Sequence, residues 1–225
     1  MGSDDYFHQR KAKKSRDLKR KQGSRTTYDK VLIVCEGEKT EVNYFEELCE
    51  YYRLSSADVK ISGDCGSAPI NVVGRAKELY REEQRKGIPF DRVYCVFDKD
   101  THDSYAPALQ AVINAKPKGT FFAINSVPCF EYWLLLHFGY TAKPFYGTTG
   151  AKSAGDQVQD ELKKCIEDYA KGNHGCFERL VDDLPQAIQY SKLALKSADA
   201  SGTDNPTTFV HELVVYLQGL SKNNR

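Results

Sequence analysis

Two short apolar runs constrain the fold of this chain more than any other feature of its sequence. Residues 31–35 read VLIVC, residues 92–97 read RVYCVF, and acidic residues follow each run closely. A strand that is covered on both faces of a parallel sheet has this continuous apolar character. A further strand is expected at 121–125. Apolar residues recur at helical spacing over 40–52, 70–86 and 105–115, so helices are expected between the strands. Such alternation predicts an α/β fold with a mostly parallel sheet flanked by helices.

Beyond residue 130 the sequence predicts helices in place of strands. Residues 130–138 are apolar on all sides, and helices are expected near 156–171, 184–200 and 207–220. We therefore expect three parts in this chain. These are a basic, flexible arm over residues 1–29, an α/β domain over residues 30–140, and a helical C-terminal extension, residues 141–225, packed on that domain.

Charge is distributed unevenly along the chain, although the formal net charge is only +1. The first thirty residues hold ten Lys or Arg against four Asp, whereas the rest holds 22 basic and 27 acidic residues. One interpretation of the basic arm is a solubilising tail. The other is an arm that binds the phosphate backbone of a nucleic acid, with a grip that weakens steeply with salt. Its candidate contacts are Arg10, Lys14, Lys19, Arg20, Lys21 and Arg25.

Cysteine usage and hydropathy indicate a cytoplasmic protein. The seven cysteines are scattered and odd in number, and none forms a C-x-x-C pair. This pattern fits neither a zinc site nor a disulfide framework, so we expect reduced thiols. No run approaches the roughly 18 to 20 apolar residues that cross a bilayer, and the N-terminal residues are charged. We therefore expect no membrane partner.

The acidic residues that follow the two apolar runs are the main candidates for chemistry. Glu36 follows the first run, and Asp98 and Asp100 follow the second. Ligands of open parallel sheets bind beyond the carboxyl ends of the strands, so neighbouring strands would bring these three carboxylates together. Such oxygen ligands suit Mg²⁺ or Mn²⁺, which substrate phosphate commonly completes. The set predicts metal-dependent phosphodiester chemistry, although acids at strand ends are also common as solvated loop residues.

Further candidates are weaker. Glu131 lies in the first turn of the apolar helix, where a carboxylate is favoured by the helix dipole, so it is a fourth catalytic candidate. Lys39, Lys99 and His137 are candidates for contacts with substrate phosphate, although a hydrogen-bonded core histidine is the simpler interpretation of His137. Thr40 is expected to cap the N-terminus of the first helix.

Several motifs together resemble the RloB family of bacterial proteins. They are VLIVCEGEKTE at 31–41, VYCVFDKDTH at 93–102, PCFEYWLLLHF at 128–138, and the NPTT and VHEL segments that begin at Asn205 and Val210. The resemblance implies a Toprim-like domain in residues 30–140, in which Glu36, Asp98 and Asp100 hold Mg²⁺ for phosphodiester cleavage. It also implies a role in antiviral defence near restriction or abortive-infection loci.

The leading hypothesis is a metal-dependent nuclease that acts on DNA or RNA in anti-phage defence, in which Glu36 is a general base or metal ligand. A non-catalytic module that binds a nucleotide or nucleic acid is the first alternative. The second is a haloacid-dehalogenase-like phosphatase, because Asp98 begins a D-x-D-x-T sequence. A partner protein from a defence system and an oligomer are both compatible with this sequence.

Overall fold

The computed structural model describes residues 29–56, 58–66, 68–147 and 152–222. The predicted basic arm, with Arg10, Lys14, Lys19, Arg20, Lys21 and Arg25, lies outside the described residues except for its last residue. None of the helices in the described ranges combines the length and the apolar character that a membrane crossing requires.

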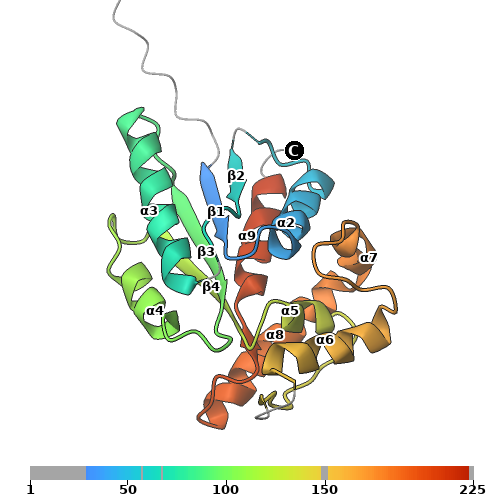
Figure 1. Ribbon diagram of the computed structural model, residues 1–225. Helices are drawn as coiled ribbons and strands as arrows, with labels where there is room; N and C mark the ends of the chain where they lie inside the picture. The colour runs from blue at the N-terminus through green and yellow to red at the C-terminus, as the bar shows by residue number, and fades with distance from the viewer. Residues whose placement is uncertain (1–28, 57, 67, 148–151, 223–225) are drawn as a thin grey trace, which may run out of the picture.

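A five-stranded sheet forms the centre of the molecule (Figure 1). The strands β1 (Val31–Cys35), β2 (Val59–Ser62), β3 (Arg92–Asp98) and β4 (Phe121–Val127) are parallel, and β5 (Thr207–Thr208) is antiparallel to β4. Their order across the sheet is β2-β1-β3-β4-β5. The predicted α/β class with a mostly parallel sheet flanked by helices is confirmed.

Helices cover both faces of the sheet, which explains why its central strands are apolar throughout. On one face lie α3 (Pro69–Arg85) and α4 (Tyr105–Ile113), and on the other lie α2 (Thr40–Tyr51) and α9 (Val210–Lys222) (Figure 1). Leu32 and Val34 of β1 belong to the α3 side, whereas Ile33 and Cys35 belong to the opposite core. Since successive side chains of a strand point to opposite faces, each residue of β1 is buried.

The remaining helices extend the core on the α2 side. They are α5 (Glu131–Leu135), α6 (Ala154–Cys165), α7 (Cys176–Leu180), a 3-10 turn η1 (Val181–Asp183) and α8 (Leu184–Ala200). One continuous hydrophobic cluster joins them to α2, α9 and the sheet. Within it, the indole N–H of Trp133 donates to the Tyr44 hydroxyl across 2.8 Å, which ties α5 to α2.

Three predicted elements differ in extent from those in the structure. The helix expected near 156–171 ends at Cys165, and a loop follows it. The helix expected from residue 207 begins at Val210, because Thr207 and Thr208 pair with Val127 and Ser126 as β5. The apolar helix expected over 130–138 is confined to Glu131–Leu135.

The order of the strands creates a crevice between β1 and β3. The chain leaves β1 for α2 on one face, and it reaches β3 through α3 on the other face. The connections therefore diverge beyond the carboxyl ends of these two neighbouring strands. In open α/β sheets this divergence is where ligands bind.

Candidate active site

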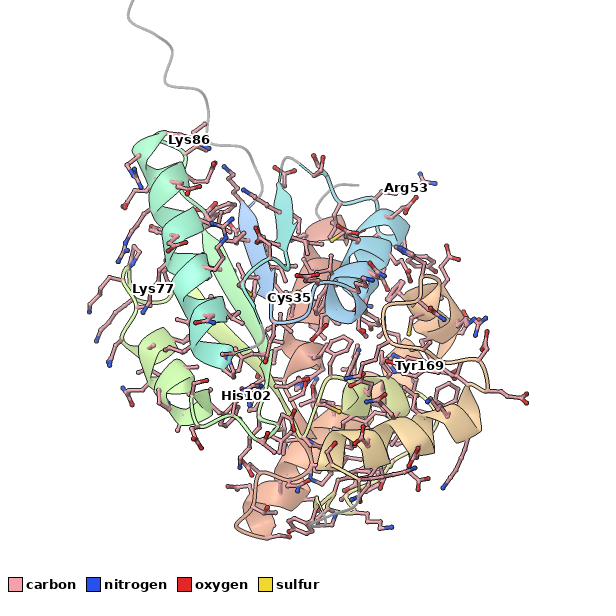
Figure 2. The ribbon with its side chains drawn as sticks, viewed as in Figure 1. Cys35, Arg53, Lys77, Lys86, His102 and Tyr169 are labelled. Atoms are coloured by element: carbon pink, nitrogen blue, oxygen red, sulfur yellow. The ribbon has the colours of Figure 1, made fainter. Side chains whose placement is uncertain are left out.

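A pocket of about 510 Å³ opens at the carboxyl ends of β1 and β3. Figure 2 labels Cys35 at the end of β1, His102 in the loop before α4, and Tyr169 in the loop after α6. The pocket is strongly acidic, because it is lined by Glu36, Glu38, Glu41, Asp98, Asp100 and Glu131.

The two predicted acidic turns meet in this pocket. The Glu36 N–H donates to the Val96 carbonyl across 3.0 Å, which continues the β1–β3 pairing by one residue. The Asp98 N–H then donates to Glu36 Oε2 across 2.9 Å, and the other carboxylate oxygen of Glu36 lies 3.6 Å from His102 Nε2. The structure therefore brings Glu36 and Asp98 together, as neighbouring strands would require.

Neighbouring carboxylates repel the negative charge of Asp98. Its Oδ2 accepts a hydrogen bond from the Phe130 N–H at 3.1 Å, immediately before α5. Burial raises the pKa of Asp98 well above its usual value, and the nearby carboxylates of Glu41 and Glu131 raise this pKa further. Because Asp98 forms no ion pair with a described basic residue, its negative charge is costly without an added cation.

Glu41 is an acid of this site that sequence reasoning did not select. It lies in the first turn of α2, is 7% exposed, and folds back against Gly37 and its own backbone N–H. Burial, reinforced by the charges of Glu131 and Glu36, raises the pKa of Glu41 to about 7. Burial also raises the pKa of Glu36, against the lowering effect of the Asp98 N–H. The sequence feature that points to Glu41 as a site residue is its place in the first turn of the helix, at the end of the E-G-E-K-T-E segment.

Asp100 lies at the exposed rim of the pocket. Its φ of 33° is in the left-handed region, which Asp tolerates better than most residues, and its N–H donates to the Pro128 carbonyl at 3.1 Å. This turn directs the chain away from β3, so Asp100 contributes to the pocket from its solvent side.

Glu131 closes the inner side of the pocket. It is 2% exposed, accepts a hydrogen bond from the Tyr169 hydroxyl at 3.2 Å, and forms an ion pair with Lys171 at 3.1 Å. Both partners come from the loop that follows α6. The sequence does not point to Tyr169 or Lys171 as site residues, because the helix expected near 156–171 includes this segment and no motif there indicates a site.

Side chains of α2 hold that loop in place. The Gly172 N–H donates to Thr40 Oγ1 at 3.0 Å, and Asn43 Nδ2 donates to the Gly172 carbonyl at 2.9 Å. One turn further on, the carboxylate of Glu47 accepts the N–H groups of Gly175 and Phe177 at 2.6 and 2.8 Å. The expected capping role of Thr40 is therefore wrong. Lys39 occupies the N-cap position without a side-chain cap, and the Thr40 hydroxyl serves the loop.

The three candidates for phosphate contact occupy different environments. Lys39 lines the pocket. Lys99 points elsewhere and forms an ion pair with Asp204 at 2.7 Å. His137 does not line the pocket, because it is 1% exposed, with its Nδ1 next to the Trp133 and Leu134 carbonyls at 3.1 and 3.2 Å.

The carboxylate oxygens of the pocket are suitable ligands for a hard divalent cation. Their positions in this structure do not form a complete coordination site. Among the described residues, no three His, Cys, Asp or Glu side chains are arranged to hold a metal ion. The carboxylates of Glu36, Glu41 and Asp98 repel one another, and Glu41 is buried while the other two are partly buried. Such carboxylates are nevertheless the oxygen ligands that Mg²⁺ and Mn²⁺ prefer. A cation would have to draw these side chains together.

The fold and this pocket define an α/β protein with an acidic site at the carboxyl ends of two neighbouring parallel strands. A family model described as RloB-like protein matches residues 31–217, and the chain belongs to this family. The resemblance found in the motifs is therefore confirmed. No curated protein and no solved structure shows a significant match to the chain.

Proposed function

We propose that this protein is a nuclease that cleaves phosphodiester bonds of DNA or RNA with Mg²⁺ or Mn²⁺. One observation carries the proposal, namely the hydrogen bond from the Asp98 N–H to Glu36 Oε2. It holds the carboxylate of Glu36 against the backbone of Asp98, so the acids that follow two neighbouring strands share one pocket. This is the arrangement that a Toprim-like domain implies. The uncompensated charge near Asp98 supports a cation there.

Glu36, Asp98 and Asp100 are the proposed metal ligands, and Glu41 and Glu131 are further acids of the pocket. A divalent cation held there would stabilise charge on the phosphoryl group and lower the pKa of a bound water. Alternatively, Glu36 would stay off the cation and accept the proton of the attacking water, because burial raises the pKa of this carboxylate. Its bond to the Asp98 N–H fixes the carboxylate for that role.

The biological setting is part of the same proposal. Membership of the RloB-like family supports a role in antiviral defence in the cytoplasm, together with a partner protein or as an oligomer. The ten basic residues among the first thirty would add sequence-independent affinity for the nucleic acid backbone.

The direct test is cleavage of labelled DNA and RNA, single- and double-stranded, by the full chain in Mg²⁺, in Mn²⁺ and in EDTA. We expect metal-dependent cleavage whose rate falls at least about 100-fold when Asp98→Asn and Asp100→Asn are combined. Loss of a group that only hydrogen-bonds to a metal ligand typically costs about 10- to 100-fold, and loss of the ligands themselves should cost more. Asp103→Asn is the matched control, since Asp103 is an exposed acid of the same loop outside the pocket lining. Unchanged cleavage by the double variant would refute the proposal.

A second candidate is a non-catalytic module that binds a nucleotide in the same pocket. It is favoured by the two acids that already face basic partners, Glu131 with Lys171 and Glu36 with His102. This candidate predicts that the full chain binds a nucleotide and does not turn it over in any divalent cation. If the cleavage assay is negative, isothermal titration calorimetry with nucleotides measures this binding.

A further inference from the structure

Two lysines lie on one rim of the acidic pocket, although they come from distant parts of the sequence. Lys39 immediately precedes α2, and Lys171 belongs to the loop after α6, and both line the pocket. The other charged residues of the lining are six acids, apart from His102 if it is protonated. The lysines therefore form the positive side of a pocket that is otherwise negative.

Gly172 brings the two lysines together. A Cβ at this position would lie only 2.9 Å from both Cβ and Cδ of Lys39, so the stem of Lys39 runs directly against the Gly172 backbone. Gly172 also has a φ of +80°, which side chains other than glycine adopt at a cost. The residue next to Lys171 is thus shaped for close approach by Lys39.

The loop that carries Lys171 is anchored to α2 at several points that follow Lys171 in the chain. Gly172 exchanges hydrogen bonds with Thr40 and Asn43, and Glu47 accepts the N–H groups of Gly175 and Phe177. All three anchoring side chains come from α2, the helix that Lys39 precedes. The separation of the two lysines is therefore set by one helix, which is the preorganisation that a binding site requires.

Neither lysine has its hydrogen-bonding capacity filled. Lys171 is 55% exposed at its side chain, and within the described ranges Glu131 is the one acid in ion-pair contact with it. Lys39 is exposed and forms no ion pair with a described residue. An ammonium group has three donors, so both can bind an additional anion.

We propose that Lys171 and Lys39 form a phosphate-binding subsite, which holds a phosphate of the nucleic acid strand against the acidic wall of the pocket. The inference rests on the proposed function, since it names the part of the pocket that overcomes repulsion between substrate and carboxylates. A polyanion approaching six acids needs a positive rim, and lysine supplies a compact charge suited to phosphate oxygens. Lys171 then binds substrate while it remains close to Glu131.

Binding without cleavage tests this subsite. A fluorescent oligonucleotide is titrated with the full chain in EDTA and in Ca²⁺, over a range of salt concentrations. We expect Lys171→Met to weaken binding about tenfold, as for loss of a charged hydrogen bond, and to reduce the salt slope by about one unit. Lys39→Met should act in the same direction. Lys152→Met is the matched control, because Lys152 is an exposed lysine paired with Asp160 outside the pocket.

Combining Lys171→Met with Glu131→Gln separates phosphate binding from simple neutralisation of Glu131. If Lys171 binds phosphate, the double variant binds the oligonucleotide about tenfold more weakly than Glu131→Gln alone. If Lys171 serves only to neutralise Glu131, the double variant equals Glu131→Gln, and the inference is overturned. Circular dichroism of each variant identifies any loss of folding, and Lys171→Arg, which keeps the charge, should restore most of the affinity in a folded protein.

Metal binding distinguishes failure of this inference from failure of the proposed function. Removing the positive charge of Lys171 should tighten Mn²⁺ binding roughly two- to tenfold, because a nearby like charge is lost. A purely structural lysine would instead weaken both Mn²⁺ and oligonucleotide binding. If the wild-type chain binds no Mn²⁺ and cleaves nothing, the proposed function fails, while the affinities in EDTA still decide whether the subsite exists.

Discussion

Glu36 and Asp98, which are 62 residues apart in the sequence, are joined by a hydrogen bond of 2.9 Å between the Asp98 N–H and Glu36 Oε2. The side chain of one acidic turn is thereby fixed by the backbone of the other. The position of Glu36 consequently depends on the pairing of β1 with β3, which buries both strands in the centre of the sheet. A change in this carboxylate can remove charge without disturbing the strands.

Glu36→Gln should remove the negative charge of this side chain while keeping its hydrogen bond to the Asp98 N–H. The amide oxygen of Gln can still accept the Asp98 N–H, so we expect the melting temperature without metal to stay equal or rise. We expect Mn²⁺ to raise the melting temperature of the wild-type protein, and loss of the carboxylate to remove most of that increase. Differential scanning fluorimetry with and without Mn²⁺ measures both effects. An undiminished Mn²⁺ effect in the variant would exclude Glu36 as a ligand.

Glu41→Gln should change the pH dependence of stability in the absence of divalent cations. The pKa of Glu41 is raised from 4.5 to about 7 in the folded protein, so the folded state binds more protons than the unfolded state between these values. The free energy of unfolding contributed by Glu41 is therefore present below pH 4.5 and is lost as pH rises through 7.

We expect Glu41→Gln to be more stable than the wild type at pH 8, by about 1 to 3 kcal/mol. Urea unfolding at several pH values measures this difference. Glu50→Gln, at an exposed position of the same helix, is the control and should show no such gain. Equal stability of Glu41→Gln and wild type at pH 8 would contradict the raised pKa.

His137 should destabilise the protein in acid. Burial lowers its pKa from 6.5 to about 4, so the unfolded state binds more protons than the folded state between these values. The free energy of unfolding therefore falls as pH drops from 6.5 to 4, by about 3 kcal/mol for this one residue. His137→Asn keeps an N–H donor near the Trp133 and Leu134 carbonyls and removes the titrating ring.

The measured quantity is the difference in unfolding free energy between His137→Asn and the wild type from pH 4 to 7. This difference cancels the opposite contribution of Glu41 and the similar contribution of His211, whose pKa is also lowered to about 4. Fluorescence of Trp133, the single tryptophan, follows the unfolding. A pH-independent difference would show that His137 is not titrating in this range.

Glu47 should determine how firmly the Lys171 loop is attached to α2. Glu47→Ala leaves the N–H groups of Gly175 and Phe177 without their acceptors, with an expected cost of about 1 to 2 kcal/mol. Glu47→Gln retains one acceptor and should cost less. Hydrogen exchange of residues 172–177 reports the detachment directly, and unchanged protection in Glu47→Ala would contradict this role.

The parts of the site that sequence could predict are those next to strongly patterned strands. Glu36 and Asp98 follow runs whose burial on both faces is visible as uninterrupted apolar sequence, so their convergence required only that the strands be neighbours. Lys171 and Tyr169 lie in a loop without periodicity, and their place depends on hydrogen bonds from Thr40, Asn43 and Glu47. Nothing local to residues 166–175 encodes those partners.

Very short elements, and residue types that suit more than one role, also limit what can be predicted from the sequence. The strand β5 has two residues, too few for a period-2 pattern, and its position depends on the exposed edge of β4. Thr40 has the residue type of a cap, and only the docked loop determines that its hydroxyl binds Gly172. His137 illustrates the reverse case, because its apolar surroundings in the sequence did indicate a core residue.

The return of β5 and α9 to the sheet has a consequence for synthesis of the protein. These elements cover the edge and one face of β4, yet the ribosome makes them after all the helices from α5 to α8. A nascent chain that has just completed β4 therefore exposes an unpaired strand edge and apolar surface until residues 207–222 emerge. We expect the sheet to reach its final packing only after this segment has been translated.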